Sequence, residues 1–447
     1  MRAVLAFVKN FFLTTRFFVL SGVIISLFLF SFFIAGLLAL AKLAGVVMIF
    51  VFVADTVVLW LPKKPLQIRR YTPARLSNGD DNPIEIFIRS KFIFPVSAIV
   101  IDELPPLLQI RNLSFKKWIA PGNEIQIRYT LRPVVRGEYH FGKVHAIVSG
   151  LAGLTARRIS EDIPVNLPCY PSFIHLRKYE LMAVTDRYAE TGHRRINSIG
   201  RSYEFDHIRN YSLGDDIRSI NWKATARRDL LMINQFREEK SQQIYCVIDA
   251  GRTMKSPFDG MTLLDYAINA SLVLSDVAVV KNDRPGLLVF SDHIHSMLLS
   301  NNRRSQISTV MEQLYNAETD FSESSFELMT INITRKVPRR SLVILFSNFE
   351  GRVSLKRQLP FLKQLAKRHL VLTVFFENTL LHEIVHQDTK RLSEVYIKTI
   401  AEKNLFERRF MAEDLARNGI IPLLTTPANL TVDAVNKYIE IKSRMII

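Results

Sequence analysis

Cysteine is almost absent from this sequence. Its two cysteines, Cys169 and Cys246, lie 77 positions apart and form no C-x-x-C pair. A disulfide framework and a cysteine-based zinc site are therefore excluded, because both need several cysteines at short spacings. Two unpaired thiols fit a reducing compartment best.

The motifs of the common enzyme classes are also missing. The chain contains no G-x-x-x-x-G-K-[ST], no G-x-G-x-x-G, no H-E-x-x-H and no G-x-S-x-G. Nucleotide-binding, zinc-peptidase and serine-hydrolase functions therefore lack the residues that their chemistry needs. His293 and His295 lie two apart, and we interpret them as surface histidines rather than metal ligands.

Acidic residues, glycine and proline are scarce. The chain of 447 residues has 42 Asp+Glu against 59 Lys+Arg, a formal charge of +17, which favours an anionic neighbour: a membrane face, a nucleic acid or an acidic protein. With 17 Gly, 18 Pro and 48% hydrophobic residues, collagen-like and disordered classes are excluded. The length leaves room for two or three folded units.

Charge is missing from one long stretch near the start of the chain. Between Phe17 and Leu61 only Lys42 and Asp55 are charged, and this length suffices for two spans of about 20 residues each. We predict a two-helix transmembrane hairpin within residues 1–64, with helices at about 17–38 and 43–61 and Lys42 near the turn or snorkelling. A cleaved signal peptide has a shorter apolar core, and no small-residue cleavage region follows here.

Flanking charge sets the expected orientation of this hairpin. Basic residues lie on both sides of it: Arg2, Lys9, Arg16, Lys63, Lys64, Arg69 and Arg70. By the positive-inside rule we expect a multi-pass protein of the cell (inner) membrane, with both termini and the soluble domains in the cytoplasm. Asp55 lies inside the second span, where a functional role, contact with interfacial water and a hydrogen bond to the partner helix all stay open.

Residues 65–165 have the pattern of short strands. The segments IEIFIRS, VSAIVID, EIQIRYTLRP and KVHAIVSG alternate or cluster β-branched residues between proline and glycine. This pattern predicts a small β-sandwich-like domain. In RGEYHFG, residues 136–142, we expect the glycines to serve the conformation of a turn and strand.

The pattern changes again after a connector at residues 166–242. From 243 to 447, apolar strands such as QQIYCVID, PGLLVFS and RSLVILFSN alternate with amphipathic helices. This alternation predicts an α/β doubly wound domain with a parallel sheet. Functional residues are then expected beyond the carboxyl ends of the strands, at 249–253, at Ser291 and Asp292, and at Ser347 and Asn348.

The connector carries the most distinctive pattern in the chain, G-x-x-F-x-x-x-R-x-Y-x-x-G-D-D-x-R-x-I-x-W-x-x-x-A-R, matched with one shifted position. The matching residues are Gly200, Phe205, Arg209, Tyr211, Gly214, Asp215, Asp216, Arg218, Ile220, Trp222, Ala226 and Arg227. In this pattern, and in its layout over nearly the whole chain, the sequence resembles the family called domain of unknown function 58. The resemblance implies a C-terminal domain similar to a von Willebrand factor A domain and a MoxR-type AAA+ ATPase as partner. It implies no enzyme activity.

A von Willebrand factor A domain collects oxygen ligands for Mg²⁺ from several loops, beginning with Asp-x-Ser-x-Ser. In this chain Asp249 and Thr253 match that motif, whereas Gly251 replaces the middle serine and Arg252 adds a positive charge. The later strand ends in Ser347-Asn348 where an Asp is expected, and Thr319 or Asp320 is the candidate for the intervening loop. Mg²⁺ at Asp249 and Thr253 and a metal-free site in which Asp249 caps the next turn both stay open, the second being preferred.

The Gly214-Asp215-Asp216 cluster allows a chemical and a structural interpretation. Its carboxylates could act as acid and base, or Gly214 could form a turn that Asp215 caps while Asp216 pairs with Arg209, Arg218 or Arg227. We favour structure, because no nucleophile or histidine lies at fixed spacing nearby. Trp222 is predicted to be a buried anchor rather than a stacking platform.

Three functions compete at this stage. The favoured one is a non-enzymatic, membrane-anchored adaptor that docks a protein partner through Asp249, Arg252, Thr253, Asp292 and Asn348. The alternative is a metal-dependent hydrolase near the cell envelope that uses Asp215, Asp216 and Asp249. Nucleic-acid binding is disfavoured, because acidic residues interleave the basic ones and point to a protein interface or anionic lipid instead.

Overall fold

The computed structural model describes residues 7–34, 36–111, 113–173, 203–212, 215, 217–228, 230–238, 241–319, 321–377, 379–386 and 391–444. The chain divides into two compact units, residues 1–170 and 171–447. Gly214, Asp216 and Asp320 lie outside the described residues, as does the side chain of Arg218.

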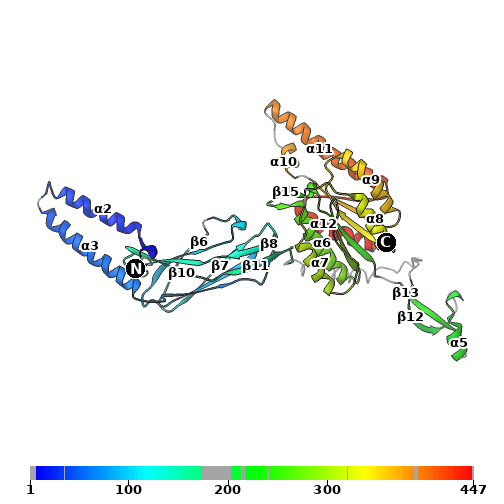
Figure 1. Cartoon of the computed structure of the whole chain (residues 1–447), viewed down its shortest axis with the longest axis horizontal. Coiled ribbons are helices and arrows are strands. Elements are labelled where there is room, and N and C mark those ends of the chain that lie inside the picture. Colours follow the sequence, from blue (N-terminus) through cyan, green and yellow to red (C-terminus); the bar gives the residue numbers. More distant parts are fainter. Residues whose placement is uncertain are drawn as a thin grey trace. The chain divides into compact units, whose positions relative to one another are not determined.

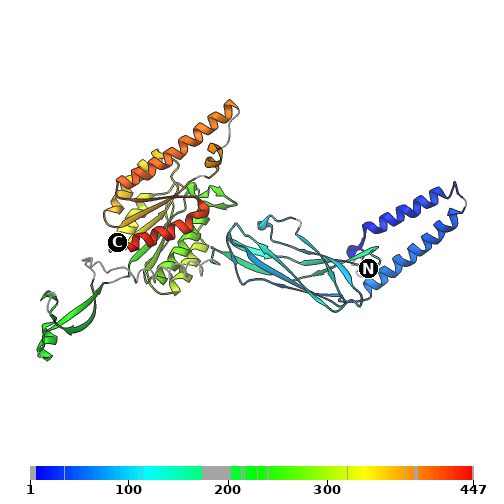
Figure 2. The same ribbon diagram turned by 180° about the vertical axis from the view of Figure 1, so that it is seen from behind.

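The first unit begins with two antiparallel apolar helices that lie side by side (Figures 1 and 2). These helices are α2 (Thr15–Phe30) and α3 (Leu37–Trp60). The predicted place of Lys42 near the turn is wrong: α2 ends at Phe30 and α3 begins at Leu37, so Lys42 lies within α3. The sequence between the two helices, SFFIAG, contains no charged residue, so the position of Lys42 did not indicate where the first helix ends.

α3 is long and apolar enough to span a membrane, and only 6% of its most apolar stretch is buried. α6 (Leu263–Val280) meets the same criteria of length and composition, but 83% of it is buried and it forms part of the core of the second unit. The exposed apolar surface of α2 and α3 therefore suggests that the chain associates with a membrane.

β-strands form the rest of the first unit, as predicted. One sheet has the order β1-β10-β9-β5-β6, a second has the order β2-β4-β7, and a third has the order β3-β11-β8. The strands are β1 (Phe11–Leu13), β2 (Leu66–Tyr71), β3 (Leu76–Ser77), β4 (Asn82–Ser90), β5 (Val96–Asp102), β6 (Ser114–Ile119), β7 (Glu124–Leu131), β8 (Gly137–Phe141), β9 (Val144–Ser149), β10 (Thr155–Glu161) and β11 (Val165–Tyr170). Their inward-facing side chains share one apolar core.

A buried ion pair joins two of these sheets. In β2 the alternation of buried and exposed residues places Arg70 in the core, where it pairs with Asp102 at the end of β5, both side chains having no exposed surface. Arg70 also donates to the carbonyls of Ile163 and Gly142, each at 3.0 Å, and Tyr129 donates to Asp102. Burial, reinforced by the charge of Asp102, raises the pKa of Tyr129 above its ordinary value, so the phenol stays a donor.

Asp55 connects α3 to the β-rich part of the unit. Its carboxylate accepts hydrogen bonds from the backbone N–H groups of Ala152, Leu154 and Thr155, at 3.2, 3.1 and 3.0 Å, and from the Thr155 hydroxyl at 3.1 Å. A Cβ at Gly150 would lie 2.2 Å from Asp55 Oδ1, so this loop can approach the carboxylate only with glycine there. Asp55 was expected to contact interfacial water or to hydrogen-bond to the partner helix, and both expectations are wrong, because its carboxylate binds the loop before β10 and the start of β10.

The second unit contains a six-stranded sheet of order β18-β17-β14-β19-β20-β21, parallel except for the edge strand β18. Its strands are β14 (Gln243–Asp249), β17 (Arg284–Phe290), β18 (Ile294–Leu298), β19 (Leu342–Phe346), β20 (Leu370–Phe376) and β21 (Ile421–Thr425). Helices cover both faces, so the predicted α/β alternation with a parallel sheet is confirmed (Figure 2).

One helical layer packs on each face of the sheet. The first layer is α6, α7 (Ser305–Tyr315) and α12 (Leu430–Ser443), and the second is α8 (Phe326–Lys336), α9 (Arg352–Ala366) and α11 (Leu392–Arg417), with α10 (Thr379–His386) next to α11. Both faces of β14 are apolar, so each face needs a helical layer to cover it. Ile244, Cys246 and Ile248 face the first layer, whereas Tyr245 and Val247 face the second. Burial raises the pKa of the Cys246 thiol to about 12, which makes it unreactive.

A separate two-stranded hairpin, here called the arm, precedes this sheet in the chain. It consists of β12 (Tyr203–Asn210) and β13 (Met232–Glu238), with α5 (Trp222–Arg228) at its tip (Figure 1). The arm contains most of the signature pattern.

Replacing Asp102 by Asn should leave Arg70 buried without its counter-ion. We expect the free energy of unfolding of the β-rich unit to fall by about 3–5 kcal/mol, because breaking a buried pair strands a charge in the core. Urea unfolding of the detergent-solubilised chain measures this. Glu85→Gln, which removes the partly exposed partner of the exposed Arg128 on the same unit, should have a far smaller effect. Equal losses in the two variants would contradict the inter-sheet role of Asp102.

Candidate functional site

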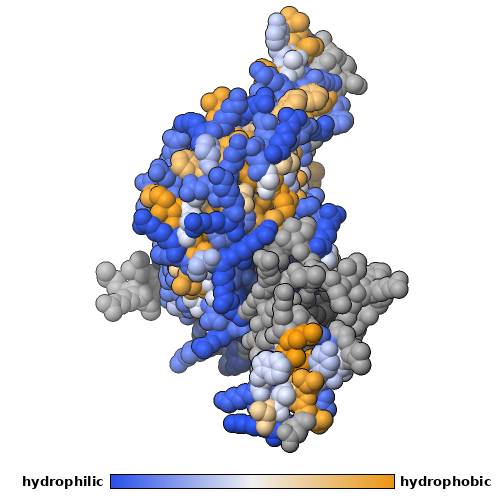
Figure 3. All heavy atoms as spheres, turned by 90° about the vertical axis from the view of Figure 1, so that its right-hand side faces the viewer, coloured by the Kyte–Doolittle hydropathy of each residue, from blue (hydrophilic) through white to orange (hydrophobic). Residues whose placement is uncertain are grey.

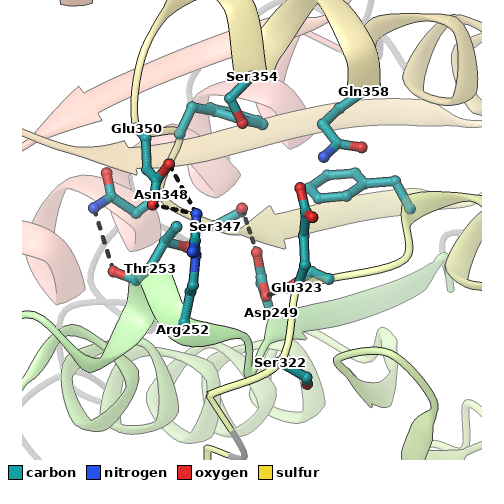
Figure 4. A pocket seen from close by; sticks show the side chains of 13 residues that line it. Asp249, Arg252, Thr253, Ser322, Glu323, Ser347, Asn348, Glu350, Ser354 and Gln358 are labelled. Atoms are coloured by element: carbon teal, nitrogen blue, oxygen red, sulfur yellow. Dashed lines mark hydrogen bonds and ion pairs between the residues drawn. The ribbon is translucent and has the colours of Figure 1, made fainter.

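The candidate site lies at the carboxyl end of β14, between two neighbouring strands. β14 pairs with β17 on one side and β19 on the other, and the chain visits β17 before it returns to β19. This reversal of strand order is the position where open α/β sheets form a crevice. A cleft is present there, lined by Asp249, Arg252, Thr253, Ser322, Glu323, Ser324, Phe326, Ser347, Asn348, Phe349, Glu350, Ser354 and Gln358 (Figure 4).

Asp249 is the buried centre of this cleft, with 2% of its surface exposed. Its Oδ2 accepts from the Ser347 hydroxyl at 2.6 Å, and its Oδ1 accepts from the Gly251 N–H at 2.8 Å and from the Ser324 hydroxyl. Burial raises the pKa of Asp249, and the three hydrogen bonds oppose this rise. Asp249 thus holds together the loops after β14 and β19 and the segment before α8.

Gly251 explains the missing serine of the motif. A Cβ at this position would lie 2.0 Å from Ser324 Oγ and 3.1 Å from Asp249 Oδ1. Ser324 therefore supplies, from the segment before α8, a hydroxyl that the motif places at 251. The Arg252 N–H donates to the Ser322 carbonyl at 3.0 Å and fixes this segment. Sequence reasoning missed Ser324 because it lies 75 positions from Asp249 in no recognised motif.

Charged and amide groups surround the mouth of the cleft. Arg252 pairs with Glu350 at 3.0 Å, with about half of each side chain exposed. Asn348 donates to the Thr253 carbonyl at 3.5 Å and accepts from Arg408 at 2.8 Å. Burial lowers the pKa of Arg408, opposed by the charges of Glu377 and Glu407. Arg252, Thr253 and Asn348 thus meet around Asp249, as expected for residues at adjacent strand ends.

Asp292 is not among the residues that line the cleft. It accepts from the Ser291 hydroxyl at 2.8 Å and from His293 at 2.7 Å, and these two hydrogen bonds lower its pKa to about 2. Asp292 lies in the turn between β17 and β18, and the hydroxyl of Ser322, which lines the cleft, also lowers its pKa, so its role in partner binding stays a prediction.

The donor set at Asp249 matches a hydroxyl network better than a metal centre. Mg²⁺ prefers oxygen ligands in an octahedral shell, usually with carboxylates. Both oxygens of Asp249 already accept protein donors, and Arg252 lines the same cleft. Over the described part of the chain, no group of three or more His, Cys, Asp or Glu side chains is arranged so that it could hold a metal ion. Mg²⁺ at Asp249 and Thr253 stays a prediction, and we derive no chemistry through it.

The signature residues build the arm. Arg209 binds Asp215 through two hydrogen bonds of 2.9 and 2.7 Å, and the Ser212 N–H donates to the same carboxylate at 2.8 Å. The hydrogen bonds from Arg209, followed by that from Ser212, lower the pKa of Asp215. Asp215 thus has a structural role. Arg209 was a candidate partner of Asp216, but in the structure it binds Asp215. Arg227 is exposed on α5.

The prediction for Trp222 is wrong. It is 69% exposed, whereas Met232 and Ile233 are the buried side chains of the arm tip. The arm is a two-stranded sheet with a single short helix, so it has too little interior to enclose a tryptophan as well.

Comparisons with known proteins find similarity over part of the chain. A family model described as "Protein of unknown function DUF58" matches residues 207–404, which confirms the resemblance over that range. The uncharacterized protein YeaD of Bacillus subtilis is 27% identical over 194 residues, 40% of this chain and 46% of that protein. This chain thus spans about half the length of that relative.

Two solved structures align with parts of the chain. One is a conserved hypothetical protein, BatB from Bacteroides thetaiotaomicron, at 15% identity and a TM-score of 0.32, covering 46% of this chain and all of that chain. The other is a PapD-like domain of human CEP192 at 10% identity and a TM-score of 0.19, covering 25% of this chain and 88% of that chain. Alignments at these scores carry no argument about fold or function.

Asp249→Asn should change how stability depends on pH. Because the pKa of Asp249 is raised above 3.8, its stabilising contribution is fully present below about pH 3.8 and is lost as pH rises through the folded-state pKa. The variant does not titrate here, so its stability relative to the parent should rise with pH, by at most about 1.4 kcal/mol per pH unit. Thermal unfolding across a pH series measures this.

Asp292→Asn is the matched control, with the opposite sign. The pKa of Asp292 is lowered from 3.8 to about 2, so its contribution is present above pH 3.8 and is lost as pH falls towards 2. As pH rises, the stability relative to the parent should therefore increase for Asp249→Asn and decrease for Asp292→Asn, the latter only between about pH 2 and pH 3.8. Parallel curves for Asp249→Asn and the parent would contradict the raised pKa.

Proposed function

We propose that this chain is a membrane-anchored, non-enzymatic adaptor whose C-terminal α/β unit docks a protein partner, a MoxR-type AAA+ ATPase. The observation that carries the proposal is the cleft at Asp249. In this cleft the carboxylate of Asp249 already accepts hydrogen bonds from protein groups, and an exposed Arg252–Glu350 ion pair lies at the mouth. An arginine whose pairing is exposed can exchange its partner for a carboxylate on another protein.

A fold similar to the von Willebrand factor A domain is the finer form of this proposal. Supporting it are the parallel sheet with helices on both faces, the Asp249 loop at its switch point and a serine hydroxyl at the place of the missing motif serine. In such a domain, partners dock at the carboxyl edge of the sheet, which is the edge that carries the cleft.

The enzyme alternative has little support among the described residues. Asp215 lies in the arm, bound to Arg209, whereas Asp249 lies in the sheet. The two carboxylates that line the cleft beside Asp249 are each paired with an arginine: Glu350 with Arg252 and Glu323 with Arg357. A catalytic pair would need a free carboxylate beside Asp249.

Arg252→Glu should weaken the capture of the ATPase without unfolding the chain. The substitution places a like charge beside Glu350 and repels a partner carboxylate, so we expect capture to fall at least about tenfold, or about 1.4 kcal/mol. Affinity capture from native membranes with Mg²⁺ and ATP, quantified by mass spectrometry, measures this.

The matched control is Arg417→Glu, which breaks an exposed pair with Glu413 at the end of α11. Because α11 ends just before β21 begins, this pair lies at the opposite edge of the sheet. Its capture should equal that of the parent. Unchanged capture in Arg252→Glu, or an equal loss in both variants, would contradict docking at the cleft.

The proposed topology has a separate test, because both native thiols are buried. Gly36→Cys places a thiol at the hairpin turn, where an added side chain meets nothing within 4 Å, and Ser443→Cys places one at the exposed end of α12. A membrane-impermeant maleimide should label Cys introduced at 36 in intact cells and label that at 443 only after permeabilisation. Labelling of both positions, or of 443 alone, in intact cells would contradict two spans with a cytoplasmic C-terminus.

A further inference from the structure

The tip of the arm exposes apolar side chains next to arginines. Ile217 and Trp222 are each 69% exposed, Leu230 is 59% and Leu231 is 47% exposed. Arg227 and Arg228 are exposed in the last turn of α5. Figure 3 shows hydrophobic side chains gathered on this tip, with hydrophilic ones at their edge. These six residues are here called the tip patch.

The exposure of Trp222 does not reflect a poorly formed tip. Asn221 caps α5 by accepting from the Ala224 N–H at 3.0 Å, and its amide donates to Asn234 on β13 at 2.8 Å. The Thr225 hydroxyl accepts from the Met232 N–H at 3.0 Å. These contacts, with the Arg209–Asp215 pair, fix α5 on the hairpin with its tryptophan outward.

A fixed patch that exposes a tryptophan beside arginines contains the residue types that are enriched in protein-binding hot spots. Trp and Arg dominate the binding energy of interfaces, and preorganisation lowers the entropy lost on binding. A fluid lipid surface needs no such fixed geometry. Among the described residues, Arg227 and Arg228 are exposed and the carboxylate of Asp215 is already bound to Arg209, so the charge of the patch is positive and favours an acidic partner surface.

We infer that the tip patch is a second docking surface, which inserts Trp222 into an apolar recess of an acidic protein partner. A second copy of this chain is a poor complement, because each copy carries a formal charge of +17. The inference does not depend on docking at Asp249, since the arm and the cleft contain different residues. Either surface can fail its own test while the other passes.

Photo-crosslinking in the full-length chain tests this inference. Trp222 is replaced by p-benzoyl-phenylalanine, cells are irradiated, and the crosslinked peptides are identified by mass spectrometry. We expect an adduct with a different protein whose crosslinked segment has an excess of Asp and Glu. Arg227→Glu with Arg228→Glu should lower its yield at least about tenfold, about 1.4 kcal/mol, by repelling that segment.

Trp118 gives the matched control, because it is also 69% exposed and lies in the β-rich unit. The same photo-reactive residue at 118 should give no such adduct, and the melting temperature of Trp222→Ala should equal that of the parent. Adducts confined to lipid or to a second copy, a crosslinked segment without acidic excess, equal adducts at 118 and 222, or a yield unchanged by charge reversal would each overturn the inference.

Discussion

The carboxylate of Asp249 is the constraint on which the functional end of the second unit depends. Its oxygens accept from Gly251 on its own loop, from Ser347 after β19 and from Ser324 before α8. These segments lie up to 98 positions apart in the chain. Because no other described group joins all three, the shape of the cleft, and the place of Arg252 at its mouth, follow from one buried acid. A charged group in such a position is tolerated only when its hydrogen bonds are complete.

The first unit uses buried charge in the same way. Arg70 and Asp102 join two sheets, and Asp55 joins α3 to the loop before β10. Each carboxylate is surrounded by donors, and glycine stands where another side chain would block the approach, as at Gly150 beside Asp55. Of the two glycines in residues 136–142, Gly137 has a φ of +130° and open space around it, as expected for a conformational role, whereas Gly142 lies against the side chain of Glu103.

Periodicity predicted the parallel strands and their helices because each buried strand is a continuous apolar run, as in residues 243–249 and 342–346. It missed the edge strand 294–298 and the helix 326–336, whose half-buried or mixed sequences give weak patterns. The strand ends led to Asp249, Arg252 and Asn348, because adjacency in a parallel sheet follows from strand order. Ser324 and the exposure of Trp222 depend on tertiary packing, which no local pattern records.

The pairing of β1 with β10 has a consequence for biosynthesis. Residues 11–13 precede the apolar helices, yet their partners are residues 155–157, about 140 positions later. At ribosomal rates of about 5–20 residues per second, the first strand waits on the order of 7–30 s for its partner. The apolar helices α2 and α3 are therefore complete while the strand before them is still unpaired. β1 can join its sheet only after β10 has been made, so the segment before α2 takes its place in the fold later than the helices that follow it.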